Sequence, residues 1–176
     1  MPQLKTPKNI SFSPDKTPKQ EPIKGEGIWS MTPSWRFCKA DVDHDRWSIC
    51  AGAEKDLIDD ECAEGGTSIT FSPTGHVCRE ILKHLISRES MTWGEIMQQS
   101  GGRSKGTNSH AIPISSLNRK AQDRINHLKI VNDSIFSLRI GGIKRIFGFI
   151  NPSDGSMDIL WYDRDHSVCK SKKKHT

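Results

Sequence analysis

Three arginines and one histidine lie near the end of the chain: Arg139, Arg145, Arg164 and His166. The guanidinium of arginine is always charged, and its planar fork of donors matches the oxygens of a phosphate group. Histidine changes protonation state near neutral pH, so it can take or give a proton. These residue types suit RNA cleavage, in which a ribose 2′-hydroxyl attacks the adjacent phosphate. His166 would act as acid or base, and the arginines would stabilise the charge on phosphorus.

The same residues also have an ordinary structural interpretation. A histidine near a chain end can simply be exposed or hydrogen-bonded, and Arg145 can form an ion pair with Asp163 or Asp165. His110 is a weaker second candidate, which we expect to be a loop residue covering the third predicted helix. Composition alone does not decide between a catalytic and a structural use of these side chains.

Charge is unevenly distributed along the chain, whose formal net charge is +5. Residues 39–64 hold nine acidic against three basic residues, and we expect this stretch to face away from any nucleic acid. Residues 102–145 hold nine basic against two acidic residues. A basic zone of this kind attracts phosphate backbones, although a solvated basic surface is the alternative. The predicted nucleic-acid-binding residues are Lys144, Arg103, Lys105, Arg119, Lys120, Arg124, Lys172, Lys173 and Lys174.

Two alternating apolar segments, 134–140 and 143–150, must position the arginines. The Gly141-Gly142 pair between them predicts a tight hairpin, which a third strand over 157–162 follows. A two-residue turn there places Arg139 opposite Lys144 and Leu138 opposite Arg145. One face of the hairpin then forms core, from Phe136, Leu138, Ile140, Ile143, Phe147 and Phe149.

Three helices are predicted before the hairpin. The first spans 73–88, and the second begins at a capping box of Thr92 and Glu95 and ends before Gly101. The third opens at Ser115 or Ser116 and carries Leu117, Ala121, Ile125 and Leu128 on its inner face. Earlier alternating segments predict strands over 35–40 and 46–50, separated by a solvated acidic turn over 41–45. The predicted class is α+β, with three helices packed on a small antiparallel sheet.

The remaining segments set the predicted domain limits. Residues 1–27 have almost no large apolar side chains, so we expect a disordered basic tail. A single domain is expected over 28–169, and a basic tail over 170–176. The glycine-rich segment 100–109 fits a flexible connection or a loop that grips phosphates. Widely spaced cysteines without a C-x-x-C pair, and the lack of a long apolar segment, predict a cytoplasmic protein with reduced thiols and no metal.

The C-terminal segments resemble the RelE/ParE toxin superfamily. The resemblance is carried by Ser137-Leu-Arg-Ile-Gly-Gly-Ile-Lys-Arg-Ile-Phe147, Asp158-Ile-Leu-Trp-Tyr162 and Asp163-Arg-Asp-His-Ser-Val168. It implies a RelE-like fold and a metal-independent endoribonuclease that cuts messenger RNA on the ribosome, needs no cofactor and pairs with an antitoxin protein. By position, Arg139, Arg145, Arg164 and His166 would form the site. Whether Lys144 or Arg145 faces it stays open, because the loop is one residue longer than in the family. The terminal tyrosine common in the ribonucleases is missing, and Cys169 lies near its place.

The resemblance also leaves a noncatalytic alternative. Members of the ParE type keep the fold and inhibit a DNA topoisomerase, so the same arrangement suits a module that binds nucleic acid or inhibits a protein partner. The enzyme and a nucleic-acid-binding module both predict RNA or another polyanion at the basic surface, whereas a partner-inhibiting module predicts a protein there. None of these interpretations calls for a membrane. They differ in what they require of His166, because only the enzyme needs a group that moves a proton.

Overall fold

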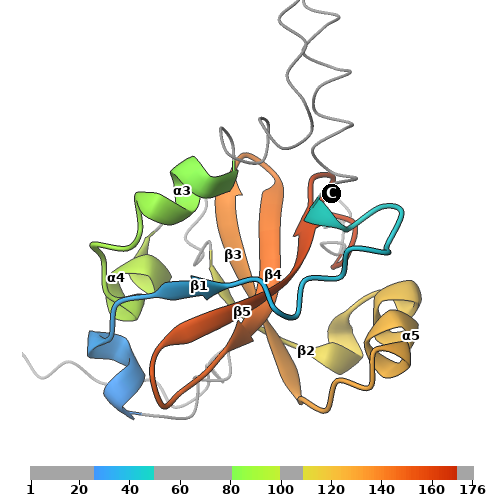
Figure 1. Cartoon of the computed structure of the whole chain (residues 1–176), viewed down its shortest axis with the longest axis horizontal. Helices are drawn as coiled ribbons and strands as arrows, with labels where there is room; N and C mark the ends of the chain where they lie inside the picture. Colours follow the sequence, from blue (N-terminus) through green and yellow to red (C-terminus); the bar gives the residue numbers. More distant parts are fainter. Residues whose placement is uncertain (1–25, 50–80, 100–108, 170–176) are drawn as a thin grey trace, which may run out of the picture.

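A five-stranded mixed sheet forms the centre of the computed structural model, which describes residues 26–49, 81–99 and 109–169. The strands are β1 (Ser34–Arg36), β2 (His110–Pro113), β3 (Ser134–Gly141), β4 (Lys144–Ile150) and β5 (Ser156–Asp163). Their order is β1-β5-β4-β3-β2 (Figure 1). β1 runs parallel to β5, and all other neighbouring pairs are antiparallel.

The α+β class is confirmed, but the prediction of a small antiparallel sheet was wrong. The segment 110–113 forms the edge strand β2, so His110 belongs to a strand that pairs with β3 and not to a loop. β1 joins the opposite edge in parallel orientation. It pairs with a strand about 120 residues later in the chain, and the tight turns that fix the direction of neighbouring strands do not act over such a separation.

Both faces of the sheet are covered. On one face, α3 (Lys83–Ile86), α4 (Trp93–Gln98) and a 3-10 turn at Glu26–Ser30 pack on a core that includes Leu138, Ile146 and Tyr162. On the other face, α5 (Arg119–His127) and Trp47 pack on Phe147, Leu160 and Trp161. Figure 1 shows α3 and α4 on one side of the strands and α5 on the other. A sheet buried on both faces has strands that are apolar at nearly every position.

This double burial explains the error in the predicted hairpin register. The structure pairs Gly141 with Lys144, Arg139 with Arg145 and Leu138 with Ile146, with an irregularity between Arg139 and Gly141. Arg139 therefore does not face Lys144. Phe136, Leu138 and Ile140 do share one face, but Phe147 and Phe149 lie on the opposite face and Ile143 is 60% exposed. Alternation could not reveal this shift because either register buries apolar side chains.

The helix predictions were partly confirmed. Thr92 and Glu95 form the predicted capping box of α4, and Trp93, Ile96 and Met97 are buried. Of the predicted helix 73–88, the described part holds α3 with Leu85 buried and Ile86 62% exposed; residues 73–80 lie outside the described ranges. Of the residues predicted for the inner face of the third helix, Ala121 and Ile125 are buried in α5, whereas Leu117 is buried before the helix and Leu128 is partly buried at its C-cap. Asn118 caps the helix, and Ser115 and Ser116 belong to a 3-10 turn before it.

The segment after β1 differs most from its prediction. No strand forms over the described residues 46–49. Two backbone hydrogen bonds attach this segment to β5: the N–H of Asp41 donates to the carbonyl oxygen of Leu160, and the N–H of Tyr162 donates to that of Trp47. The prediction of a solvated turn was wrong for Asp41, which is 5% exposed. Leu160, whose carbonyl accepts the bond from Asp41, lies at a bulge where β5 has one more residue than β4. Gly148 opposite this bulge has no space for a side chain, since a Cβ would approach the carbonyl oxygen of Asp158 to 2.4 Å.

Candidate nucleic-acid interface

Three charged residues form a row across one end of the sheet. Arg139 of β3 is the direct neighbour of Arg145 of β4, which in turn is the direct neighbour of Asp163 of β5. Residues paired across antiparallel strands point to the same face. Arg145 therefore points to the same face of the sheet as Arg139, and the preceding residue of β4, Lys144, points to the other face.

Asp163 organises the turn that follows β5. It is 1% exposed, and its carboxylate accepts hydrogen bonds from the Ser167 hydroxyl at 3.0 Å and the Val168 backbone N–H at 2.7 Å. The Ser167 hydroxyl also accepts a bond from the indole N–H of Trp47 at 2.9 Å. These contacts close the turn around His166, which has a left-handed backbone with φ of 53°. A non-glycine residue held in that conformation costs about 1–3 kcal/mol and is often found at functional sites.

His166 lies close enough to the charged row for all three residues to act on its pKa. Burial lowers the pKa of His166 below its ordinary value, and the charges of Arg145 and Arg139 lower it further. Asp163 acts in the opposite direction but does not reverse the shift. The imidazole is therefore neutral at pH 7, the form that accepts a proton.

Arg145 is held near the turn of the hairpin by backbone contacts. Its guanidinium donates to the carbonyl oxygens of Gly142 at 3.3 Å and Lys144 at 3.0 Å. Burial and the neighbouring charge of Arg139 lower the pKa of Arg145, whereas Asp163 raises it. Two like charges placed directly opposite each other destabilise a strand pair. An anion bound between Arg139 and Arg145 would relieve that repulsion.

Arg88 is a further cation at this end of the sheet that the sequence did not indicate. Its guanidinium donates to the backbone oxygens of His84 at 2.6 Å and Arg139 at 3.0 Å, and burial lowers its pKa. The Nε atom of Arg88 is buried and has no hydrogen-bond partner in the structure. Since Ser109 accepts the bond from the N–H of Arg139, Arg88 and Ser109 together hold the backbone that carries the Arg139 side chain.

The other predicted site residues are placed in different surroundings. Arg164 is half-buried just after β5, and it is not among the groups that shift the pKa of His166 or Arg145. On α5, Arg119 pairs with Asp123 in an exposed i,i+4 contact at 3.0 Å, and Lys120 lines a polar surface hollow. The predicted residues Arg103, Lys105, Lys172, Lys173 and Lys174 lie outside the described ranges.

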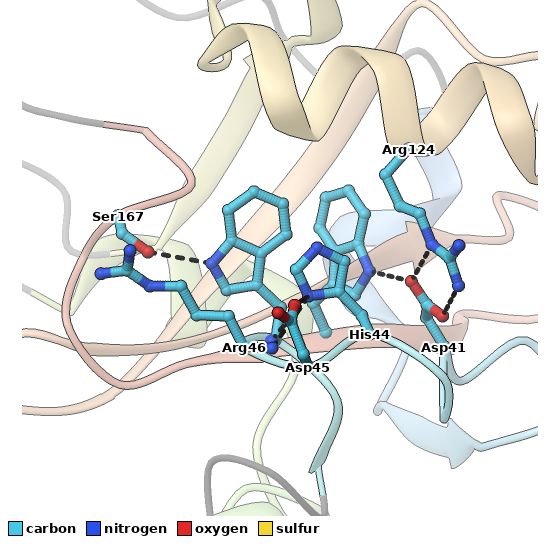
Figure 2. A network of polar contacts seen from close by, with 8 residues as sticks. Asp41, His44, Asp45, Arg46, Arg124 and Ser167 are labelled. Carbon is cyan, nitrogen blue, oxygen red and sulfur yellow. Dashed lines mark hydrogen bonds and ion pairs between the residues drawn. The ribbon is translucent and has the colours of Figure 1, made fainter.

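Arg124, also predicted to bind nucleic acid, forms an ion pair with Asp41. Two of its three guanidinium nitrogens, Nε and Nη2, donate to the carboxylate at 2.8 and 2.6 Å, and Trp161 donates its indole N–H to it at 2.9 Å (Figure 2). Burial alone would raise the pKa of Asp41, but the bonds from Arg124 and Trp161 outweigh it and the net shift is downward. The acidic segment thus neutralises part of the basic surface of α5.

Aromatic rings connect this ion pair to the charged row. Trp161 packs on Trp47 with 5.0 Å between ring centroids, and His44 stacks on Trp47 at 4.4 Å. Figure 2 shows Asp41 and Arg124 at one end of this arrangement and Ser167 at the other. The segment 41–48 therefore supports both α5 and the turn that holds His166.

Comparisons with protein-family models, with curated proteins and with solved structures found no match for this chain. Within the described residues, no group of three His, Cys, Asp or Glu side chains is arranged to hold a metal ion. None of the helices described is long and apolar enough to span a membrane.

Proposed function

We propose that the chain is a metal-independent endoribonuclease of RelE-like type, with its site at the row formed by Arg139 and Arg145 beside His166. The observation that carries the proposal is the direct pairing of Arg139 with Arg145 across the hairpin, in a row that ends at Asp163, which organises the turn of His166. Burial and both arginines lower the pKa of His166, which favours its neutral form. A phosphate between the two guanidinium groups would gain charge-assisted hydrogen bonds from both and remove their mutual repulsion. This favours a ligand with a phosphodiester over a purely structural use.

The reaction follows from the roles of these groups. His166 takes the proton of a ribose 2′-hydroxyl, and the 2′ oxygen attacks the adjacent phosphorus. Arg139 and Arg145 stabilise the added negative charge of the phosphorane. The bond from phosphorus to the 5′ oxygen then breaks, and that oxygen takes a proton from water. The products are a 2′,3′-cyclic phosphate and a 5′-hydroxyl. Arg88 acts as a positioning residue through its bond to the Arg139 carbonyl.

A noncatalytic nucleic-acid-binding or partner-inhibiting module is the second candidate. It is favoured by the observation that Asp163, the one acid in the row, already accepts bonds from Ser167 and Val168. Because these bonds occupy the Asp163 carboxylate, proton transfer at the row would depend on the adjacent His166, whereas binding requires only the cations. A nucleic-acid-binding module uses the same surface for the same polyanionic ligand without bond cleavage, and a partner-inhibiting module uses it for a protein.

Cleavage of a long messenger RNA in the presence of EDTA, with and without ribosomes, separates the candidates. For the enzyme, His166→Ala lowers the cleavage rate by about 10²- to 10⁴-fold, the usual contribution of a general acid or base. RNA affinity changes little, because His166 acts in the transition state. Arg145→Ala should also abolish cleavage.

The matched control is Arg36→Ala, because Arg36 is a half-exposed arginine of β1 that pairs with Asp158, at the opposite end of β5 from Asp163, and its loss should leave cleavage unchanged. Without EDTA-resistant cleavage by the wild type, the enzyme proposal fails. Binding without cleavage supports the second candidate. In that case Arg145→Ala lowers the slope of log affinity against log salt by about 0.7, the value for one phosphate contact on a single strand.

A further inference from the structure

A pocket lies on the other face of the sheet, directly behind the arginine row. Its volume is about 340 Å³, and its lining comes from α3, the turn of the β3–β4 hairpin and β5. The lining residues are His84, Ile140, Gly141, Gly142, Ile143, Lys144 and Tyr162. Figure 1 shows α3 beside the turn end of the hairpin. The volume falls in the range of about 300–1,000 Å³ that is usual for small-ligand sites.

The lining chemistry suits a flat ring with polar edges. Ile140 and Ile143 supply apolar walls, the buried Tyr162 closes the floor, and His84 supplies a ring on which another ring can stack. Aromatic side chains of this kind form the platforms on which single-stranded nucleic acids lay their bases. Ile143 is 60% exposed, so the apolar wall extends to the surface and the pocket is open to a ligand from solvent.

Strand geometry links this pocket to the arginine row. Lys144 and Arg145 are consecutive in β4, so their side chains point to opposite faces. Lys144 lines the pocket, and Arg145 belongs to the row. A single strand that crosses the start of β4 can therefore place a phosphate on the row and the adjoining nucleotide at the pocket.

We propose that this pocket binds one nucleobase of the RNA strand whose phosphate lies between Arg139 and Arg145. The inference rests on the proposed function for the identity of the ligand, but it concerns a separate set of side chains. The pocket holds the base next to the cleaved or bound phosphate and fixes which phosphate enters the row. His84 supplies the stacking ring, Tyr162 lies buried beneath the pocket, and Ile143 covers the outer edge.

Gly141 gives a direct way to close the pocket. Its φ lies outside the left-handed region, and a Cβ there would meet only the imidazole Nε2 of His84, at 3.9 Å. Gly141→Val therefore projects methyl groups toward the pocket without a clash at Cβ, and a β-branched residue suits a strand. His84→Ala removes a stacking ring instead. Ile86→Ala is the control for α3, because Ile86 is 62% exposed and does not line the pocket.

The test measures binding of short single-stranded RNA in which every 2′ position is O-methylated, so that cleavage by 2′-hydroxyl attack is blocked. A series of these oligonucleotides carries one abasic site at each position in turn. In the wild type, one position should weaken binding by about 5- to 150-fold, the equivalent of one base stacked on an aromatic ring. In Gly141→Val and His84→Ala, the intact oligonucleotide binds more weakly, and the same abasic site has little further effect. Ile86→Ala behaves as the wild type.

The outcomes separate this inference from the proposed function. Equal effects of abasic sites in the wild type and in both pocket variants would contradict the proposed base pocket. In that case, an RNA affinity that still falls in Arg145→Ala would show that the phosphate binds at the row independently of the pocket. Wild-type protein that binds none of the oligonucleotides would overturn both. If Gly141→Val is poorly folded, the result with His84→Ala decides.

Discussion

At the scale of single residues, the charge of His166 is set by its neighbours. Burial and two arginines favour the neutral imidazole, and the buried Asp163 favours the charged form. Arg145 and Asp163 are direct neighbours across β4 and β5, and their opposite charges shift the pKa of His166 in opposite directions. The protonation of His166 therefore reports whether the row is assembled as described.

We predict that two substitutions shift the pKa of His166 in opposite directions. Arg145→Gln removes a positive charge and should raise it, and Asp163→Asn removes a negative charge and should lower it. Histidine ring resonances followed by NMR over pH 4–9 give both values. Arg119→Gln is the control, since Arg119 is not among the groups that act on His166. Shifts of the same sign in the two variants would show that His166 does not lie beside the row.

At the scale of elements, one buried ion pair attaches α5 to the segment that follows β1. The Asp41 side chain is 1% exposed and that of Arg124 is 22% exposed, and Trp161 of β5 shares the carboxylate. Helix α5 also packs through Ala121 and Ile125 on the sheet. Its apolar face and its ion pair thus lie against different parts of the structure, and together they fix its orientation.

We predict that Arg124→Ala lowers the free energy of unfolding by about 3 kcal/mol, because it leaves the buried carboxylate of Asp41 without its cation. Arg119→Ala on the same helix should cost about 0–0.5 kcal/mol, since its pair with Asp123 is exposed. Urea unfolding followed by tryptophan fluorescence gives both values. Similar losses for the two variants would mean that the Asp41 pair is no more important than a surface contact.

At the scale of the whole molecule, two histidines link stability to pH. The Nδ1 atom of His44 accepts the backbone N–H groups of Arg46 at 3.1 Å and Trp47 at 3.0 Å, so this nitrogen carries no proton. The approach of Asp45 to the same atom, at 3.5 Å, is therefore not an ion pair in this state. Burial lowers the pKa of both His44 and His166. Protonation of either one disfavours the folded state.

We predict that the protein loses stability as the pH falls below about 6.5, the ordinary histidine value. With lowered folded-state pKa values, the unfolded chain binds more protons in this range, so the free energy of unfolding rises with pH. Urea titrations between pH 7.5 and pH 5 measure the slope. His44→Asn keeps an acceptor for the two N–H groups but does not titrate, and it should reduce the slope. Asp41 does not interfere, because its lowered pKa matters only below about pH 4. A slope that is unchanged in His44→Asn would contradict the assignment.

Several parts of the fold and the candidate site were predictable from the sequence. The capping box at Thr92, the apolar face of α5 and the existence of the hairpin all follow from signals within a few residues of each other. The same local reasoning placed Arg139, Arg145 and His166 in one C-terminal meander. It missed Arg88 and His84, because nothing in the pattern of a short helix indicates that it ends beside a hairpin turn.

The sequence by itself determined the capped helix α4, the apolar face of α5, the β3–β4 hairpin and which chemical groups lie near the C-terminus, because caps, turns and periodicity are local. It did not determine that His110–Pro113 forms an edge strand. Only the tertiary structure decided which of Lys144 and Arg145 joins the row, since an irregularity at the hairpin turn shifts the register and both faces are apolar. It also decided the parallel pairing of β1 with β5 and the burial of Asp41 against Arg124, 83 residues away. Contacts over such separations depend on how the layers pack, and short-range sequence patterns carry no information about that packing.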